Sequence, residues 1–304
     1  MKRLAVVLAV VAVVAACGSD GDSEDDQSSG DNQTTAMPTE IVATSGDRVV
    51  VLSSKSGKVV RTLVEGPDAA GASSVAVSGD GELVYFTRAD PDALCGEVPA
   101  RQIATVPIDG GEVLVYASGQ DPVVSPDGSR LAYATGGPNQ CGPPTLIAVE
   151  ELGADTFSQQ LIDEGGSALR PLAWAQDGQR ILFEAASSPD SAPELRISDD
   201  PPPSSVYGLS GTAATFRGNR VAVALPAGDG FRVVVDKTPP ESGVRRLLRA
   251  DGSSPTALAF DKSGDSLAHV SGGSLFRWSE GDDKPQKLAD NVIVGAWVPL
   301  ANAS

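Results

Sequence analysis

The chain has 304 residues and is strongly acidic, with 40 aspartate and glutamate residues against 23 lysine and arginine residues and a formal net charge of −17 at pH 7. This balance argues against nucleic acid as a partner, because affinity for nucleic acid comes mainly from cationic contacts with phosphates. A chain of this length can bury a large core in one domain, and we expect a monomer.

The N-terminus predicts a signal peptide. Lys2 and Arg3 precede an unbroken apolar run at 4–16, LAVVLAVVAVVAA. As a helix this run would span about 20 Å, short of the ~30 Å hydrocarbon core of a bilayer, and a short apolar run behind a positive start is typical of secretion signals. Its end, VAAC, resembles the lipobox of bacterial lipoproteins. The resemblance implies cleavage before Cys17 and lipidation of its thiol, with residues 1–16 as the signal peptide; the alternative is a secretory signal with an incidental cysteine.

Residues 17–40 are expected to be the lipidated cysteine and a disordered acidic linker. The segment 18–40 holds seven carboxylates and no lysine or arginine. It has too little apolar surface to offset the entropy cost of ordering, and as a flexible coil it would span on the order of 25 Å. The stretch DGDSEDD faintly resembles a calcium loop, but Asp25 stands where an EF-hand needs its turn glycine. A solvated spacer is therefore the better interpretation.

The remaining body, 41–304, keeps 33 acidic and 21 basic residues, a net charge of −12. Anionic lipid headgroups would repel such a body, so membrane attachment has to come from the lipid on Cys17. The predicted location is the extracytoplasmic face of a bacterial cell membrane.

The body begins with a segment, 41–64, that offers three strands, and then repeats one unit. Each copy is an apolar strand, a turn ending in glycine and a strand with alternating apolar residues. The copies read VAVSGDGELVYFT, VVSPDGSRLAYAT, PLAWAQDGQRILFEA, AATFRGNRVAVAL and ALAFDKSGDSLAHVS. The turn glycines are Gly81, Gly128, Gly178, Gly218 and Gly264, spaced by 47, 50, 40 and 46 residues. A unit of this size with four short strands is typical of a propeller blade.

Alternation in the second strand of each copy predicts one buried face. We align Leu83, Leu131, Ile181, Val221 and Leu267 at one position, and Tyr85, Tyr133, Phe183, Val223 and His269 two residues later. Adjacent blades would bury this face against each other. Helical periodicity is found only in the leader, and dense glycine and proline turn signals favour an all-β chain.

The two ends of the body complete the strand count. Residues 291–299 offer one strand, which would join the three strands of 41–64 in a composite blade. Pairing the ends removes exposed sheet edges. We therefore predict an all-β, six-bladed β-propeller over 41–304, closed by its N- and C-terminal strands; seven blades or an open stack of sheets are the alternatives.

The second copy carries a family resemblance. Ser125, Pro126, Asp127 and Gly128 match the S-P-D-G repeat of TolB-like, WD40-like β-propellers in full. The other copies depart from it: residues 78–81 read SGDG and lack the proline, and the third and fourth turns are further from the pattern. The resemblance implies the fold across about 41–299. It implies little about function, because such propellers serve many functions.

Cys95 and Cys141 lie one repeat apart, each followed by glycine and then by proline within three residues. Both fall in the loop after the second strand of neighbouring blades. An exported protein meets an oxidising compartment, so we predict a disulfide that joins these two blades at one rim. Two separate buried thiols are the alternative.

Catalytic and metal-binding motifs are scarce. The one histidine, His269, stands where other copies hold Tyr or Phe, which favours a packing role. One histidine and two spare cysteines do not make a usual zinc site, and the sequence contains neither a G-x-S-x-G elbow nor a phosphate-binding loop. The Asp-Gly pairs are explained by turn formation. We expect no metal, no cofactor and no catalytic residue.

Two functional hypotheses remain. The first is a non-catalytic, lipid-anchored binding or scaffold module for proteins, peptides or polymers of the cell envelope. The second is an extracytoplasmic propeller enzyme, such as a lyase or a quinone-dependent oxidoreductase, with a site at the central channel. Convergent buried carboxylates with perturbed pKa values at that channel would favour the enzyme.

Overall fold

The computed structural model describes residues 40–136, 142–153, 159–165, 167–175, 178–188, 191, 193–198, 205–206, 213–217, 220–227, 230–237, 246–251, 255, 257–260, 266–279 and 284–297. The expected signal peptide, Cys17 and the linker up to residue 39 lie outside these residues, as does Cys141. Among the described residues, no helix has the length and apolar character needed to cross a membrane.

The described part is all-β apart from a short 3-10 helix, Gly66–Ala69. Its strands form six antiparallel four-stranded sheets. The first sheet contains β24 (Val294–Trp297), β1 (Glu40–Thr44), β2 (Arg48–Ser53) and β3 (Val59–Glu65); the second contains β4 (Val75–Val77), β5 (Leu83–Cys95), β6 (Val98–Pro107) and β7 (Leu114–Ser118). The third contains β8 (Gln120–Val124), β9 (Arg130–Thr135), β10 (Leu146–Glu151) and β11 (Gln159–Asp163); the fourth contains β12 (Ala168–Trp174), β13 (Ile181–Ala186), β14 (Glu194–Ile197) and β15 (Ser205–Val206). The fifth contains β16 (Ala213–Arg217), β17 (Arg220–Ala227), β18 (Gly230–Lys237) and β19 (Arg246–Asp251); the sixth contains β20 (Ala257–Phe260), β21 (Ser266–Ser271), β22 (Ser274–Ser279) and β23 (Gln286–Asp290).

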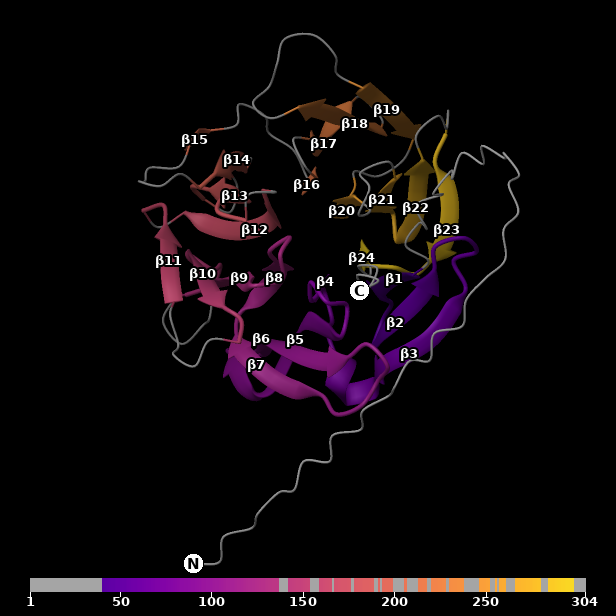
Figure 1. Ribbon diagram of the computed structural model, residues 1–304. Helices are drawn as coiled ribbons and strands as arrows, with labels where there is room; N and C mark the ends of the chain where they lie inside the picture. The colour runs from indigo at the N-terminus through magenta and orange to yellow at the C-terminus, as the bar shows by residue number, and fades with distance from the viewer. Residues whose placement is uncertain are drawn as a thin grey trace, which may run out of the picture. The chain divides into compact units, whose positions relative to one another are not determined.

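Five sheets are built from consecutive strands, whereas the first combines both ends of the described chain. β1 pairs with β24 in the register Ile41 to Trp297 and Thr44 to Val294. The first strands of neighbouring sheets contact each other in chain order, from β4 to β8, β12, β16 and β20, then β24, which contacts β4 again. Figure 1 shows the sheets following one another in this order.

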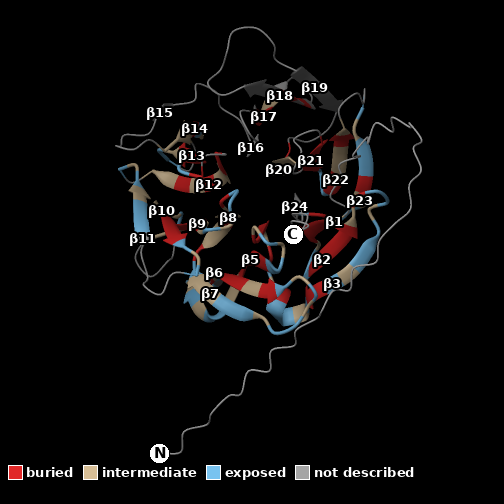
Figure 2. Cartoon of the chain, in the orientation of Figure 1, coloured by how far each residue is buried: buried red, intermediate tan, exposed pale blue. Residues whose placement is uncertain are grey.

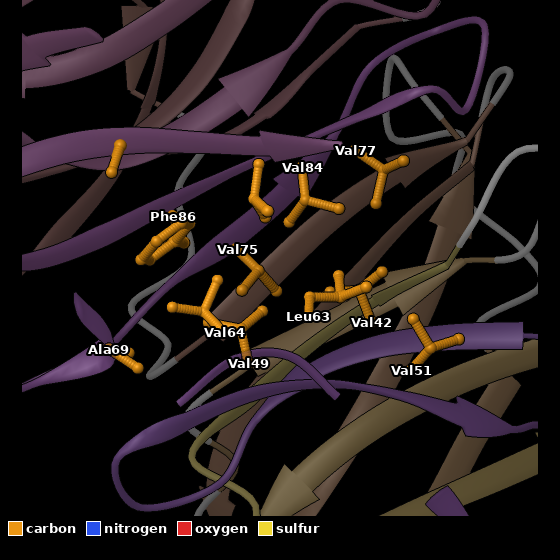
Figure 3. Close-up of a cluster of buried hydrophobic side chains, with 13 residues drawn as sticks. Val42, Val49, Val51, Leu63, Val64, Ala69, Val75, Val77, Val84 and Phe86 are labelled. Carbon is orange, nitrogen blue, oxygen red and sulfur yellow. The ribbon is translucent and has the colours of Figure 1, made fainter. Parts of the chain in front are cut away.

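Apolar side chains fill the spaces between neighbouring sheets. Figure 3 shows one such cluster, in which Val42, Val49 and Val51 of the first sheet pack against Val84 and Phe86 of the second. Burial is concentrated in strands such as β1 and β2, whereas β3, β7 and β11 carry exposed residues (Figure 2). This gradient follows from sheet order, because the first strands of neighbouring sheets contact one another, whereas β3, β7 and β11 are the last strands of their sheets and have a neighbouring strand on only one side.

The predicted buried face is right in four copies and shifted by one residue in the first. Leu131, Ile181, Val221 and Leu267 are at most 3 % exposed, but Leu83 is 37 % exposed. Both turns fix the register: the Ser78 hydroxyl accepts from the Leu83 N–H, and the Ser125 hydroxyl from the Arg130 N–H. Leu83 is therefore equivalent to Arg130, and Val84 and Phe86 are equivalent to Leu131 and Tyr133. A slip of one residue moves a side chain to the other face of a strand, so Tyr85 faces the third sheet instead of the first.

The turns of the second and third sheets touch through their backbones. A Cβ added at Gly79 would lie 2.5 Å from the Cα of Gly128. Such a contact leaves no room for a side chain, so the residue before Asp80 has to be glycine. This explains why the first copy lacks the proline found at Pro126.

Candidate functional site

Polar side chains from three sheets meet where β8 and β12 begin. Asp121 in β8 has a φ of +55°, a left-handed conformation that non-glycine residues rarely adopt. Its backbone N–H donates to the Thr87 hydroxyl at 2.9 Å, and Thr87 is hydrogen-bonded to Ser74 at 2.6 Å. Thr87 lies in β5 and Ser74 directly precedes β4, so both belong to the second sheet, and both are buried. The strained backbone of Asp121 is thus held by buried partners in the neighbouring sheet.

The fourth sheet adds an arginine and a second carboxylate. Arg170 Nη1 donates to Glu184 Oε2 at 3.3 Å, and Arg170 Nε lies 4.0 Å from Asp121 Oδ2. Burial raises the pKa of Glu184; Arg170 opposes this effect, and the charge of Asp121 adds to it. We call Thr87, Asp121, Arg170 and Glu184 the β8–β12 cluster. It places one guanidinium between two carboxylates from different sheets.

A cavity of about 320 Å³ adjoins this cluster between the second and third sheets. Its described lining residues are Cys95, Pro99, Ala100, Arg101, Gly119, Gln120, Ala134, Thr135, Gly136, Gly142 and Pro144. Gln120 connects the two features, because its Nε2 donates to Asp121 Oδ2 at 3.2 Å. The Thr135 hydroxyl donates to the Ser118 carbonyl at 3.3 Å, and Arg101 Nη1 donates to the Gly71 carbonyl at 2.7 Å. The cavity therefore offers one cation, one amide and one hydroxyl among small side chains, which suits binding of a small polar group.

A third polar group lies deeper between the same two sheets. Glu150 in β10 is 5 % exposed, and both of its carboxylate oxygens accept hydrogen bonds from tyrosines. Tyr133 donates to Oε1, and Tyr116 in β7 donates to Oε2 at 2.9 Å. Burial and the hydrogen bond to Glu150 raise the pKa of Tyr116. The group joins the second and third sheets.

Among the described residues that the sequence singled out, all but one lie apart from the cavity. Residues 125–128 form the turn between β8 and β9, at the opposite end of these strands from Gln120. The Ser125 hydroxyl donates to Asp127 Oδ1 at 2.6 Å, and Gly128 has a φ of +74°. The hydrogen bonds from Ser125 and Ser129 lower the pKa of Asp127 to about 2.

Cys95 is the exception, because it ends β5 and lines the cavity. Cys141 lies outside the described residues, but the next residue, Gly142, lines the same cavity. The disulfide between Cys95 and Cys141 therefore stays a prediction. Cys17, the predicted lipidation site, also lies outside the described part.

His269 packs as the sequence predicts. It is 2 % exposed and stacks against Phe276 and Trp278, with ring centroids 4.8 and 4.6 Å away. Burial lowers the pKa of His269 to about 4. It belongs to the sixth sheet, whereas the cavity lies between the second and third.

Sequence reasoning missed Asp121, Arg170 and Glu184. They are far apart along the chain and belong to two different repeat copies, so spacing gave no signal that they meet. A weak signal was present in Gln120-Asp121-Pro122, two polar residues directly before an apolar strand. Within the described ranges, no group of three or more His, Cys, Asp or Glu side chains is arranged to hold a metal ion.

Sheet order and the repeated strand–turn–strand unit define a β-propeller fold of the TolB-like kind. A solved structure of a protein assigned as TolB from Agrobacterium tumefaciens superimposes with a TM-score of 0.59 over 84 % of this chain and 90 % of that one, at 13 % identity. The tricorn protease matches with a TM-score of 0.56 over 84 % of this chain and 26 % of its own, at 14 % identity. A chain of the mitotic checkpoint complex matches with a TM-score of 0.52 over 86 % of this chain and 80 % of its own, at 16 % identity. No protein-family model and no curated protein sequence matches the chain. Identities this low carry the fold alone.

Proposed function

We propose that this chain is a lipid-anchored, extracytoplasmic propeller that binds a protein or peptide of the bacterial cell envelope without transforming it. The cavity beside the β8–β12 cluster carries the proposal, because it combines a concave surface with several convergent polar groups. The TolB-like fold supports a binding or scaffold role in general terms. No cofactor or metal is part of the proposal, and the domain is proposed to act as a monomer.

In-cell crosslinking tests this function. A photo-crosslinking amino acid at Pro144, which lines the cavity, should capture a reproducible set of envelope proteins. The matched control carries it at Lys55, an exposed residue in the turn between β2 and β3. Equal capture from both positions, or none from either, would contradict a binding site at the cavity.

The anchor is the second part of the proposal. The charged start, the short apolar run and Cys17 together support lipidation. Cys17→Ser should leave a product that is either retained uncleaved or released as a soluble protein. A variant that is processed at the same position and fractionates with membranes as the wild type does would rule out the lipid anchor.

Ring closure is the third part. We infer six blades joined into one ring, supported by six four-stranded sheets and by the pairing of β24 with β1. Deleting residues 291–304 would leave the β1 backbone groups unpaired on one side, so we expect loss of cooperative unfolding or aggregation. Deleting residues 18–38 should leave the melting temperature unchanged. A body without 291–304 that melts like the intact one would point to another topology.

The proposed disulfide between Cys95 and Cys141 would hold two loops together at the cavity. Support comes from Cys95 and Gly142, which line the same cavity. In the chain-entropy account a loop of this length contributes about 4 kcal/mol. Unfolded protein lipidated at Cys17 should show no free thiol before reduction and two after it. Two thiols before reduction would disprove the bond.

One observation favours the propeller enzyme as a second candidate. Asp121 and Glu184 converge on Arg170, and burial raises the pKa of Glu184, a combination found at acid–base sites. Incubation with envelope polysaccharides and peptides, followed by mass spectrometry of products, separates the candidates. Turnover that is abolished by Asp121→Asn and by Glu184→Gln would favour the enzyme, and intact polymers would favour binding.

A further inference from the structure

We propose that the cavity between the second and third sheets binds a carboxylate and that Arg101 is its anchor. This inference rests on the proposed binding function and names the chemical group that the cavity selects. Arg101 is the only charged residue in the described lining, and its side chain carries a positive charge in a body whose net charge is −12.

Arg101 has no carboxylate partner in the described part of the chain. Four other arginines each lie within 4.0 Å of an acidic side chain: Arg61, Arg88, Arg170 and Arg196. The hydrogen bond of Arg101 is instead made by Nη1 to the Gly71 carbonyl at 2.7 Å. A guanidinium has five N–H donors, so this bond leaves most of them available to a ligand.

The backbone around Gly71 holds the guanidinium in place. Gly71 has a φ of +67°, and a Cβ there would lie 3.0 Å from Arg101 Nη1. The glycine thus gives room for the arginine head, while its carbonyl fixes one side of the fork. A guanidinium oriented in this way binds a carboxylate with less loss of side-chain freedom than a free surface arginine does.

The rest of the cavity suits a small organic acid or the end of a peptide. Gln120 and Thr135 add neutral hydrogen-bonding groups, and prolines, alanines and glycines form most of the remaining wall. The volume of about 320 Å³ lies at the lower end of the range for small-molecule sites. Two sources carry the same group: the C-terminal carboxylate of a partner protein, or a free small carboxylic acid.

Equilibrium dialysis of the full chain, purified in detergent, tests the inference. One arm uses a pool of N-acetylated tripeptides with free C-terminal carboxylates and a matched pool of C-terminal amides. A second arm uses unbranched mono- and dicarboxylic acids of two to eight carbons. We expect carboxylates from at least one arm to be retained, and for peptides the amides to bind at least tenfold more weakly. Retention in the peptide arm identifies a chain end, and retention in the acid arm alone identifies a free metabolite.

Variants locate the binding. Arg101→Gln should weaken carboxylate binding at least tenfold, and Arg101→Lys should give an intermediate loss because it keeps the charge without the fork. Arg48→Gln removes an exposed arginine of β2 and should change nothing. Equal retention of carboxylates and amides by the wild type, no retention of any carboxylate, or wild-type binding by Arg101→Gln, would overturn the inference; the comparison with amides requires no variant to fold.

The outcomes also separate this inference from the proposed function. Arg101-dependent carboxylate binding without any crosslinked envelope protein would refute the envelope-partner role and leave the carboxylate site standing. Envelope crosslinks that are the same in wild type and Arg101→Gln, with no carboxylate retained, would refute the carboxylate site alone.

Discussion

Tyr133 and His269 stand at equivalent positions in the third and sixth sheets, five residues after Gly128 and Gly264, yet they are satisfied by different chemistry. Tyr133 is 4 % exposed and donates to the buried carboxylate of Glu150. His269 is 2 % exposed and lies among Phe231, Phe276 and Trp278, and its Nδ1 has no hydrogen-bond partner in the described part. Both sheets hold a buried flat ring at this position, and the neighbouring side chains decide whether its polar atom has a hydrogen-bond partner.

This difference between Tyr133 and His269 predicts which perturbation weakens each of the two contacts between sheets. The contact between the second and third sheets depends on close backbones and hydrogen bonds, so it should be sensitive to atoms added or removed at neutral pH. At the contact between the fifth and sixth sheets, Phe231 lies edge-on against the neutral ring of His269, so this contact should be sensitive to acid.

The largest effect is expected from crowding the contact between the second and third sheets. Gly79→Ala places a methyl group 2.5 Å from the Cα of Gly128 and should lower the free energy of unfolding by about 3 kcal/mol. Denaturant unfolding measures this loss. Pro126→Ala, an exposed position in the equivalent turn, is the control and should cost less than about 1 kcal/mol. A Gly79→Ala protein as stable as wild type would show that the two turns can separate freely.

Removing the tyrosine hydroxyl should have the next largest effect. Tyr133→Phe takes one donor from a buried carboxylate and should cost about 2–3 kcal/mol at pH 7.5. Tyr85→Phe is the matched control, because Tyr85 is equally buried but donates no hydrogen bond to the described residues. Equal stabilities of the two variants would mean that Glu150 does not depend on Tyr133.

Acid should weaken the contact between the fifth and sixth sheets through His269. The pKa of His269 is lowered to about 4 in the folded chain, against about 6.5 when unfolded. Between these pH values the unfolded chain binds a proton that the folded chain does not. The free energy of unfolding is therefore highest above about pH 6.5 and falls as the pH decreases. The loss between pH 7.5 and 5 should be about 2 kcal/mol.

His269→Phe keeps the ring and removes the titration. The loss of stability from pH 7.5 to pH 5 should therefore be smaller in this variant by about that amount, whatever its stability at pH 7.5. If the free energies of unfolding of the two proteins depend on pH in the same way, His269 binds its proton as readily in the folded chain as in the unfolded chain.

The smallest effect is expected in the turn of the third sheet. Asp127 accepts from Ser125 and Ser129, which lowers its pKa to about 2, but the carboxylate is largely exposed. Asp127→Asn should cost about 0.5–1 kcal/mol after solvent screening above about pH 4, where the aspartate is ionised in both the folded and the unfolded chain. This cost should decrease as the pH falls from 4 toward 2, the pKa of the folded aspartate. A cost that is the same at pH 7 and at pH 2 would assign the effect to shape instead of charge.

Local chemistry made the strands and turns predictable. A serine and an aspartate bind nearby N–H groups, and a following glycine takes a positive φ, so the turns at Gly81 and Gly128 could be predicted from the sequence. The turn at Gly178 lacks the serine, but its glycine also has a positive φ. The one-residue slip at Leu83 arose from aligning similar letters. Counting from the turn serine, whose hydroxyl binds the fifth residue after it in the second and third sheets, would have avoided it.

The site was not predictable in the same way. Asp121, Arg170 and Glu184 meet only because β8 and β12 lie side by side, a contact between sheets that leaves no mark on the spacing of any single copy. The role of Gly79 was hidden for the same reason: its partner, Gly128, is 49 residues away. The repeated pattern predicts the strands and turns within each copy, whereas the contacts between copies are found only in the three-dimensional structure.

The order of strands in the first sheet also has a mechanical consequence. β1, the strand nearest the N-terminus among the described residues, lies between β2 and β24, with five paired positions on one side and four on the other. A force pulling on the segment before Glu40 would have to shear two hydrogen-bonded ladders at once, whereas an edge strand could be peeled from one. A body dragged by its N-terminal end would therefore resist unravelling at the point where the load enters.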